Sequence, residues 1–107
     1  MPTLCVTSNV KPGDLKAFNL ELSQLAAKTF NKVERIILVS FDYQPHMSFA
    51  GTFEPAFLLA INSVGNMTPE NNIVYSKIFF DFFGRTLGAP DDRGYMFVLS
   101  ITCVGLS

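Results

Sequence analysis

Apolar residues recur at helical spacing in two segments of the chain. In residues 15–30 they fall every three or four positions, which places them on one face of a helix. This stripe consists of Leu15, Phe18, Leu22, Leu25, Ala26 and Phe30. Asp14 is suited to cap the N-terminus, and Asn31 and Lys32 are suited to the C-terminal end. The pattern therefore predicts an amphipathic helix over residues 15–30.

The second helical pattern lies in residues 69–87. Thr68 followed by Pro69 is typical of a helix start, and Gly88 suits the position just past a helix end. The apolar positions are Ile73, Val74, Ile78, Phe79, Phe82, Phe83 and Leu87. We expect a second helix over residues 69–87, again with an apolar stripe along one side.

Four further segments have the composition of β-strands. They are residues 3–8, 35–43, 56–63 and 95–103. Residues 35–43 are mostly apolar, which is expected of a strand that is covered on both faces. Residues 44–55 are predicted to form a loop, with a short strand at residues 47–49.

The elements follow in the order strand, helix, strand, and this order occurs twice. Two β-α-β units can place four strands in one mixed sheet with both helices on one face. The predicted fold class is therefore α+β, an α/β sandwich formed by a single domain over residues 1–107. Many unrelated functions share this order of elements, so topology alone assigns none of them.

The composition favours an oligomer and argues against nucleic acid. Of the 107 residues, 49% are hydrophobic and 16% are charged, which is much apolar material for so small a domain to bury. The formal net charge is -1, without a basic stripe or a run of like charge. The apolar runs are far shorter than a bilayer span, so we expect no membrane partner.

Cysteine and histidine usage gives little support to a metal site. The two cysteines, Cys5 and Cys103, are expected to be small buried thiols in a reducing, cytoplasmic compartment, since no signal peptide is apparent. The only histidine, His46, lies in the predicted loop, and no second histidine or cysteine cluster accompanies it. We therefore expect His46 to be exposed and without a catalytic role.

Pro2 carries the most distinctive chemistry in the sequence. Removal of Met1 would leave the secondary amine of a proline at the start of the strand over residues 3–8. A free α-amine has a pKa of about 8 in water, and burial lowers this pKa because it disfavours the charged form. Such an amine can act as a general base near neutral pH.

Several motifs occur together with Pro2. They are residues 7–10 (Thr-Ser-Asn-Val), 31–32 (Asn-Lys), 47–55 (Met-Ser-Phe-Ala-Gly-Thr-Phe-Glu-Pro), 62–65 (Asn-Ser-Val-Gly) and 90–95 (Pro-Asp-Asp-Arg-Gly-Tyr). Across residues 1–98 the sequence resembles the macrophage migration inhibitory factor family, which includes D-dopachrome tautomerase, within the tautomerase superfamily. The resemblance implies a homotrimer whose sheets surround a central channel, with an active site at each subunit interface.

The resemblance also implies roles for five residues. Pro2 matches the catalytic base, and Lys32 matches the lysine that binds the substrate carboxylate and helps lower the pKa of the proline amine. Val64 matches an apolar wall residue that also offers a backbone amide, and Tyr95 matches the tyrosine given by the neighbouring subunit. Phe97 stands where asparagine is common, which removes a polar substrate contact. The implied chemistry needs no metal and no organic cofactor.

Two other segments depart from the family pattern. Residues 56–59 replace a Cys-x-x-Cys motif, so a thiol–disulfide activity is not supported. Residues 104–107 end where the family usually continues with a short hairpin that joins subunits and closes the pocket. We expect a weaker trimer and a less complete substrate pocket for this reason.

Two functions remain open at this point. The first is a keto–enol tautomerase acting on small aromatic 2-oxo acids of the phenylpyruvate or dopachrome type, with cytokine-like activity beside it. The alternative is a secreted signalling protein that binds a cell-surface receptor and has a vestigial pocket. Pro2 and Lys32 favour the enzyme, whereas Phe97 and the short tail favour the alternative. The resemblance implies a cytoplasmic protein that can be secreted without a signal peptide.

Overall fold

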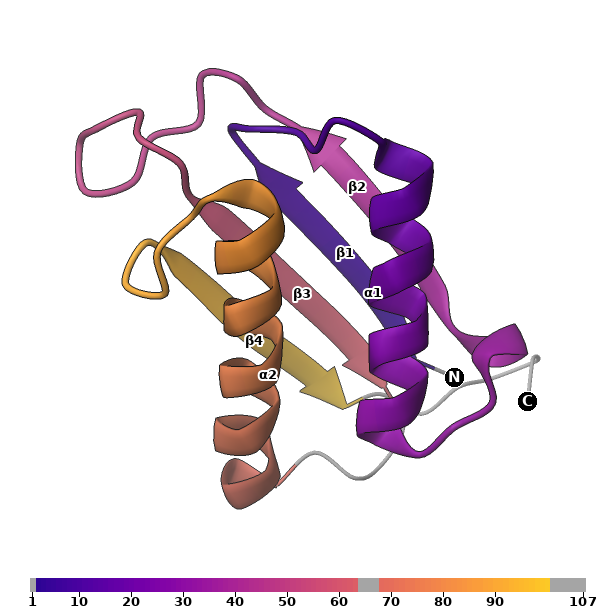
Figure 1. The fold of residues 1–107 in the computed structure, drawn as a ribbon. Helices are drawn as coiled ribbons and strands as arrows, with labels where there is room; N and C mark the ends of the chain where they lie inside the picture. Colours follow the sequence, from indigo (N-terminus) through magenta and orange to yellow (C-terminus); the bar gives the residue numbers. More distant parts are fainter. Residues whose placement is uncertain (1, 64–67, 101–107) are drawn as a thin grey trace.

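A computed structural model describes residues 2–63 and 68–100 of the chain, and within these residues it contains the four predicted strands and two predicted helices, together with one 3₁₀ turn that was not predicted (Figure 1). They are β1 (Thr3–Ser8), α1 (Leu15–Phe30), the 3₁₀ turn η1 (Glu34–Ile36), β2 (Leu38–Tyr43), β3 (Phe57–Ser63), α2 (Pro69–Leu87) and β4 (Gly94–Ser100). The order strand, helix, strand, repeated once, is thereby confirmed.

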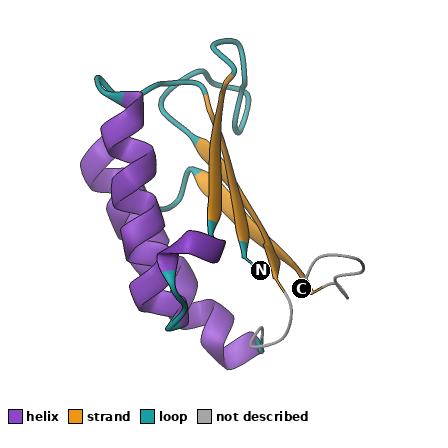
Figure 2. Ribbon diagram, turned by 90° about the vertical axis from the view of Figure 1, so that its right-hand side faces the viewer, coloured by secondary structure: helices purple, strands orange, loops and turns teal. Residues whose placement is uncertain are grey.

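The four strands form one mixed sheet in the order β2-β1-β3-β4. Within each β-α-β unit the strands are parallel, and the two units join through the antiparallel pair β1–β3, in which Leu4 lies opposite Ile61. Both helices cover the same face of this sheet (Figure 2). The predicted α+β fold class is therefore confirmed.

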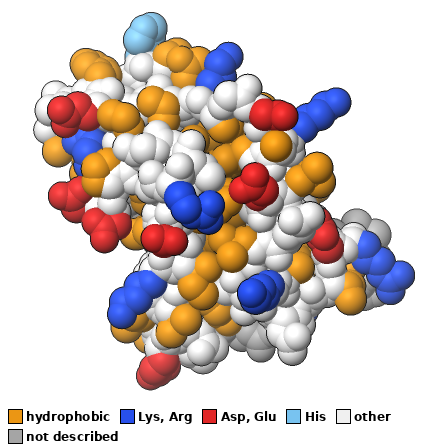
Figure 3. All heavy atoms as spheres, in the orientation of Figure 1, with side chains coloured by type: hydrophobic (Ala, Val, Ile, Leu, Met, Phe, Trp, Pro, Cys, Tyr) orange, Lys and Arg blue, Asp and Glu red, His pale blue; other side chains and the backbone are white. Residues whose placement is uncertain are grey.

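The core lies between the helices and the covered face of the sheet. Leu4 and Val6 of β1 and Leu59 and Ile61 of β3 point into it and are at most 1% exposed. The helices contribute Phe18, Leu22, Ala26, Phe30, Phe79, Phe82, Phe83 and Leu87. Phenylalanine rings dominate the packing, and the rings of Phe57 and Phe83 have centroids 4.8 Å apart. On the outer side of the helices, Lys and Arg side chains are interspersed with Asp and Glu (Figure 3).

The other face of the sheet, here called the open face, has no helix over it within residues 2–63 and 68–100 (Figure 2). The strand register aligns its side chains in three rows: Leu38, Thr3, Asn62 and Leu99; Ser40, Cys5, Ala60 and Phe97; and Asp42, Thr7, Leu58 and Tyr95. The β1 and β3 members are half-buried, whereas the β2 and β4 members are exposed. The open face therefore offers apolar side chains at both of its margins.

The helix ends follow the predicted capping residues. The Asp14 carboxylate accepts a hydrogen bond from the Ala17 amide at 3.1 Å, and Asn31 ends α1 in the left-handed conformation with φ of 55°. Thr68 caps α2 through its hydroxyl oxygen, and Gly88 ends it with φ of 69°. These local signals fixed both helix boundaries correctly.

The prediction for residues 35–43 was wrong in two respects. The chain first forms η1, so the strand begins only at Leu38. β2 is also an edge strand, and Leu38 is 58% exposed rather than covered on both faces. An apolar run does not distinguish a face covered by the same chain from one that the chain leaves open. The same holds for Ile73 and Val74, which are 60% and 54% exposed on α2.

Other predicted boundaries need smaller corrections. The third strand starts at Phe57 rather than residue 56, and the fourth starts at Gly94 rather than residue 95. Residues 101–103 of the predicted fourth strand, with Cys103, lie outside the described residues. In place of a short strand at residues 47–49, the structure has a single bridge between Phe49 and Thr52.

Candidate active site

Pro2 lies buried at the start of β1, a central strand of the sheet. Its carbonyl oxygen accepts a hydrogen bond from the Leu38 amide at 3.1 Å, which ties the residue to the beginning of β2. The backbone of Pro2 is therefore held in place by the sheet, and its ring is out of contact with water.

Lys32 lies at the same end of the molecule as Pro2. It follows Asn31, the last capping residue of α1, and its amide donates to the Ala27 carbonyl at 3.0 Å. Because α1 runs back along β1, the C-terminus of the helix lies beside the start of the strand (Figure 1). The Lys32 side chain is exposed, so its charge is available to a ligand. Val64 lies outside the described residues.

Tyr95 and Phe97 lie on the open face of β4, with 66% and 49% of their side chains exposed. Tyr95 is opposite Leu58, which is opposite Thr7, five residues along β1 from Pro2. A rise of about 3.3 Å per residue and a strand spacing of about 4.8 Å separate Pro2 from Tyr95 by about 19 Å. One chain therefore does not bring Pro2 and Tyr95 together, and a site that contains both needs a second copy.

Asn9 organises the loop between β2 and β3, a role that was not predicted for it. The residue is 6% exposed, and its amide nitrogen donates to the carbonyls of Met47, Phe53 and Glu54 at 3.1, 3.2 and 2.9 Å. Its amide oxygen accepts from the Ala56 amide at 2.9 Å. All four partners are distant from Asn9 in the sequence. The one local signal for its role in holding the loop is its position directly after a strand.

A tight hairpin inside this loop places an aromatic ring against Tyr95. Phe49 and Thr52 exchange two backbone hydrogen bonds of 2.9 and 3.0 Å. Ala50 and Gly51 between them have φ of 54° and 76°, as a type I′ turn requires. The ring of Phe49 lies with its centroid 5.4 Å from that of Tyr95. The predicted loop thus contributes to the surroundings of a predicted site residue.

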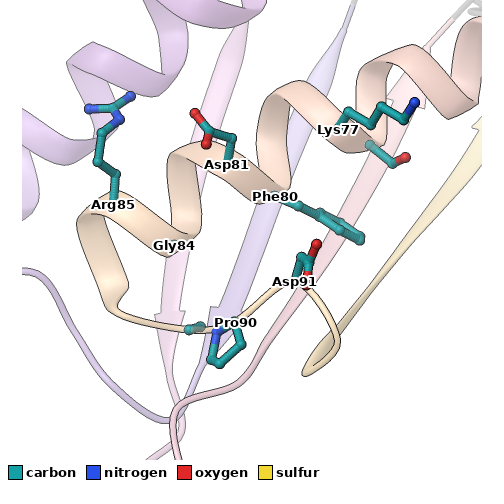
Figure 4. A pocket seen from close by; sticks show the side chains of 9 residues that line it. Lys77, Phe80, Asp81, Gly84, Arg85, Pro90 and Asp91 are labelled. Atoms are coloured by element: carbon teal, nitrogen blue, oxygen red, sulfur yellow. The ribbon is translucent and has the colours of Figure 1, made fainter.

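Hollows in the surface lie mainly around α2. One of about 450 Å³ is lined by the second half of α2 and the turn that follows it, and it contains none of the five predicted residues (Figure 4). Of its four charged residues, Asp81 and Arg85 extend to the same side of α2, Lys77 extends toward the other end of the helix, and Asp91 lies on the turn after it (Figure 4). These charged groups therefore do not converge on a common point. Another hollow, of about 340 Å³, lies between α2 and β4 and includes Tyr95. We therefore take the predicted residues, and not the first hollow, as the candidate site.

The described residues contain neither a group of metal ligands nor a helix that could span a membrane. Within residues 2–63 and 68–100, no group of three histidine, cysteine or acidic side chains could hold a metal ion. In the same part of the chain, neither helix is long and apolar enough to cross a membrane. His46 is exposed, and Cys5 is a free, half-buried thiol on the open face.

Two β-α-β units in one mixed sheet, with a proline at the start of a central strand, define a protein of the tautomerase superfamily. More narrowly, the chain belongs to the macrophage migration inhibitory factor family. The family model described as "Macrophage migration inhibitory factor (MIF)" matches residues 1–106. The predicted family is thus confirmed.

Individual relatives agree with this assignment. The macrophage migration inhibitory factor homolog of Trichinella spiralis is 26% identical over 102 residues, covering 94% of this chain and 90% of that protein. Macrophage migration inhibitory factor of Rattus norvegicus is 30% identical over 97 residues, covering 90% of this chain and 84% of that protein.

Solved structures show the same fold. The Trichinella spiralis factor superposes with a TM-score of 0.86 at 24% identity, over 98% of this chain and 94% of that chain. The factor of Oncomelania hupensis superposes with a TM-score of 0.90 at 18% identity, over 100% of this chain and 78% of that chain. At these identities the likeness supports the fold and leaves the chemistry to be argued from the residues.

Proposed function

We propose that this protein is a keto–enol tautomerase that uses Pro2 as its general base and acts on small aromatic 2-oxo acids of the phenylpyruvate or dopachrome type. The observation that carries the proposal is the burial of Pro2 at the start of a central strand. Removal of Met1 frees its amine at that position, where the low polarity of the surroundings favours the neutral, proton-accepting form.

The proposed reaction moves one proton from carbon to oxygen. The Pro2 amine takes the proton from the carbon beside the substrate carbonyl, and the C–H electron pair forms the new C=C bond. The carbonyl oxygen then gains charge and takes up a proton from water, which gives the enol, and the protonated Pro2 amine returns its proton to water. Lys32 holds the substrate carboxylate by a charge-assisted hydrogen bond. Tyr95, Phe97 and Val64 form the wall against the aromatic ring, and Val64 also offers its backbone amide.

The proposed assembly is a homotrimer, in which one chain gives Pro2 and Lys32 and its neighbour gives Tyr95 and Phe97. Two observations support it. The separation of about 19 Å between Pro2 and Tyr95 within one chain requires a second copy to complete the site. The open face also leaves Leu38, Tyr95, Phe97 and Leu99 between 49% and 66% exposed, which is typical of a surface that another subunit covers.

A second candidate function is that of a secreted, cytokine-like protein that leaves the cytoplasm without a signal peptide and binds a cell-surface receptor. Phe97 favours it, because a phenyl ring on β4 gives no polar contact to a substrate. Relatives in this family carry the name of a migration inhibitory factor, which also favours a signalling role. In that case the pocket would be vestigial and the trimer surface would carry the activity.

The decisive experiment replaces the proposed base. In protein whose intact mass shows that Met1 has been removed, Pro2→Gly should lower phenylpyruvate turnover by about 100-fold or more, since general bases contribute roughly that much. Protein that retains Met1 should be equally slow, because its Pro2 nitrogen is part of a peptide bond. Pro12→Gly, which changes a proline in the turn after β1, is the matched control and should keep normal turnover. Full activity in Pro2→Gly would contradict the proposal.

A further inference from the structure

Arg93 precedes β4 and reaches back to the loop between β2 and β3. Its Nε donates to the Pro55 carbonyl at 3.0 Å, and one terminal nitrogen donates to the Glu54 carbonyl at 2.9 Å. Its own carbonyl accepts from the Phe57 amide at 3.1 Å. Arg93 therefore fixes the end of this loop to the start of β4 from outside, while Asn9 holds the same Glu54 carbonyl from inside.

The guanidinium of Arg93 also lies over the ring of Phe49, with 5.3 Å between its central carbon and the ring centroid. Phe49 in turn lies against Tyr95, with 5.4 Å between centroids and 46° between ring planes. Both distances fall within the ranges of cation–π and aromatic pairs. The three side chains thus form a row of cation, phenyl ring and phenol ring.

Phe49 is held in this row by its own backbone. Both hydrogen bonds of the Phe49–Thr52 hairpin are formed, and Asn9 anchors Met47 two residues earlier. Tyr95, in contrast, is 66% exposed. Within residues 2–63 and 68–100, Phe49 is the aromatic side chain that contacts it. The rigid partner in this pair is therefore Phe49, and the orientation of the Tyr95 ring depends on it.

We propose that Phe49 and Arg93 are positioning residues that orient Tyr95 before substrate binds, and so set the affinity for substrates with an aromatic ring. This inference rests on the proposed tautomerase function. An exposed tyrosine loses side-chain freedom when it closes on a ligand, and a ring already held in place loses less. Phe49 lies in the loop between β2 and β3, and Arg93 binds this loop. In the proposed trimer, the neighbouring chain therefore contributes this loop to the site together with Tyr95.

The test compares an aromatic with an aliphatic substrate. Phe49→Leu keeps an apolar side chain but removes the ring, and it should raise KM for phenylpyruvate by about 2- to 10-fold with little change in kcat. KM for 4-methyl-2-oxopentanoate, which has no ring, should stay unchanged. Phe53→Leu is the matched control in the same loop, because Phe53 is 65% exposed, and it should behave as wild type.

Arg93 is tested in the same way. Arg93→Met should raise KM for phenylpyruvate, as Phe49→Leu does. Arg93→Lys should raise this KM less, because it keeps a cation over the ring. If Phe49→Leu or Arg93→Met changes KM equally for both substrates, the effect is a general structural one and the inference is wrong.

A second readout separates this inference from the proposed function. NMR signals of the Tyr95 ring should shift in Phe49→Leu and Arg93→Met but stay in place in Phe53→Leu. Titration of the same samples with phenylpyruvate gives Kd without any turnover, and Kd should rise in the first two variants. If the wild-type protein binds phenylpyruvate but does not turn it over, the proposed tautomerase activity is wrong, whereas the role of Phe49 and Arg93 in binding can still be correct. Unshifted Tyr95 signals, or an unchanged Kd, would overturn the role of Phe49 and Arg93.

Discussion

The two faces of the sheet are built from the same four strands and differ in almost every other respect. On the covered face, Leu4, Val6, Leu59 and Ile61 are at most 1% exposed and pack against phenylalanine rings from both helices. On the open face, Thr3, Cys5 and Thr7 of β1 alternate with those core residues and are only half-buried. The contrast lies both in the side chains that each strand presents alternately to the two faces and in what covers each face.

The difference separates two tasks of the molecule. The covered face contains the apolar contacts that hold the two β-α-β units together, so it determines the fold. The open face carries the aromatic residues Tyr95 and Phe97 on its margin, and neither helix of the described residues covers it (Figure 2). In the proposed trimer, its residues would serve subunit contact and substrate contact rather than the folding of the single chain.

Removal of a large ring from the covered face should produce the largest effect. Phe83 is 0% exposed and packs against Phe57 and Phe18, so Phe83→Ala should lower the free energy of unfolding by about 3–5 kcal/mol. Urea denaturation at fixed chain concentration measures this loss. Phe53→Ala, with a ring that is 65% exposed, is the control and should change the free energy of unfolding by less than about 0.5 kcal/mol. Similar losses in both variants would remove the distinction between covered and open surfaces.

A charge on the open face should break assembly and spare the fold. Phe97 lies in the row with Ala60, Cys5 and Ser40, so Phe97→Asp would place a carboxylate where we propose that a neighbouring subunit packs. Sedimentation of wild type should give about three times the chain mass of 11.9 kDa, and the variant should sediment as a single chain with an unchanged circular dichroism spectrum. A trimer that survives the substitution would show that the open face is not the interface.

The smallest expected effect comes from one methyl group at Gly94. A Cβ at this position would overlap the buried Phe57 ring, so Gly94→Ala should lower the free energy of unfolding by about 1–3 kcal/mol. Gly84 offers a matched control on the outer side of α2, because a Cβ there would lie 3.6 Å from the Ala89 carbonyl oxygen, an ordinary contact. Gly84→Ala should raise the free energy of unfolding by about 0.5–1 kcal/mol. A stabilised Gly94→Ala would mean that the covered face is less tightly packed than described.

Local signals in the sequence were sufficient to predict the helices. Asp14, Asn31, Thr68 and Gly88 act through neighbours a few residues away, so capping and periodicity together gave correct boundaries. The 3₁₀ turn at Glu34–Ile36 was missed, because Ile36, its one apolar residue, continues the apolar run of the strand that follows. Where partners are local, the sequence is therefore informative about structure.

The candidate site depends on contacts that no local signal encodes. The distance between Pro2 and Tyr95 follows from the antiparallel pairing of β1 with β3, and the order of elements alone does not specify that pairing. Asn9 and Arg93 lie in two of the motifs, but they bind carbonyls 38 or more residues away, so the motifs did not reveal these hydrogen bonds. The resemblance to a family supplied the candidate residues, and the strand register supplied their separation.

The central place of β1 affects how the chain folds as it is synthesised. β1 is made before β2 and β3, yet it must pair with β2 on one side and with β3 on the other. Leu4 can therefore pair with Ile61 only after β3 has been made. A nascent chain that ends at Tyr43 can form only the first β-α-β unit, with one edge of β1 unpaired and Leu4 and Val6 not yet covered by α2. Folding slows as contacting residues lie farther apart along the chain. We therefore expect β1 to pair with β2 before it pairs with β3, and the second edge of β1 to stay unpaired until β3 has been made.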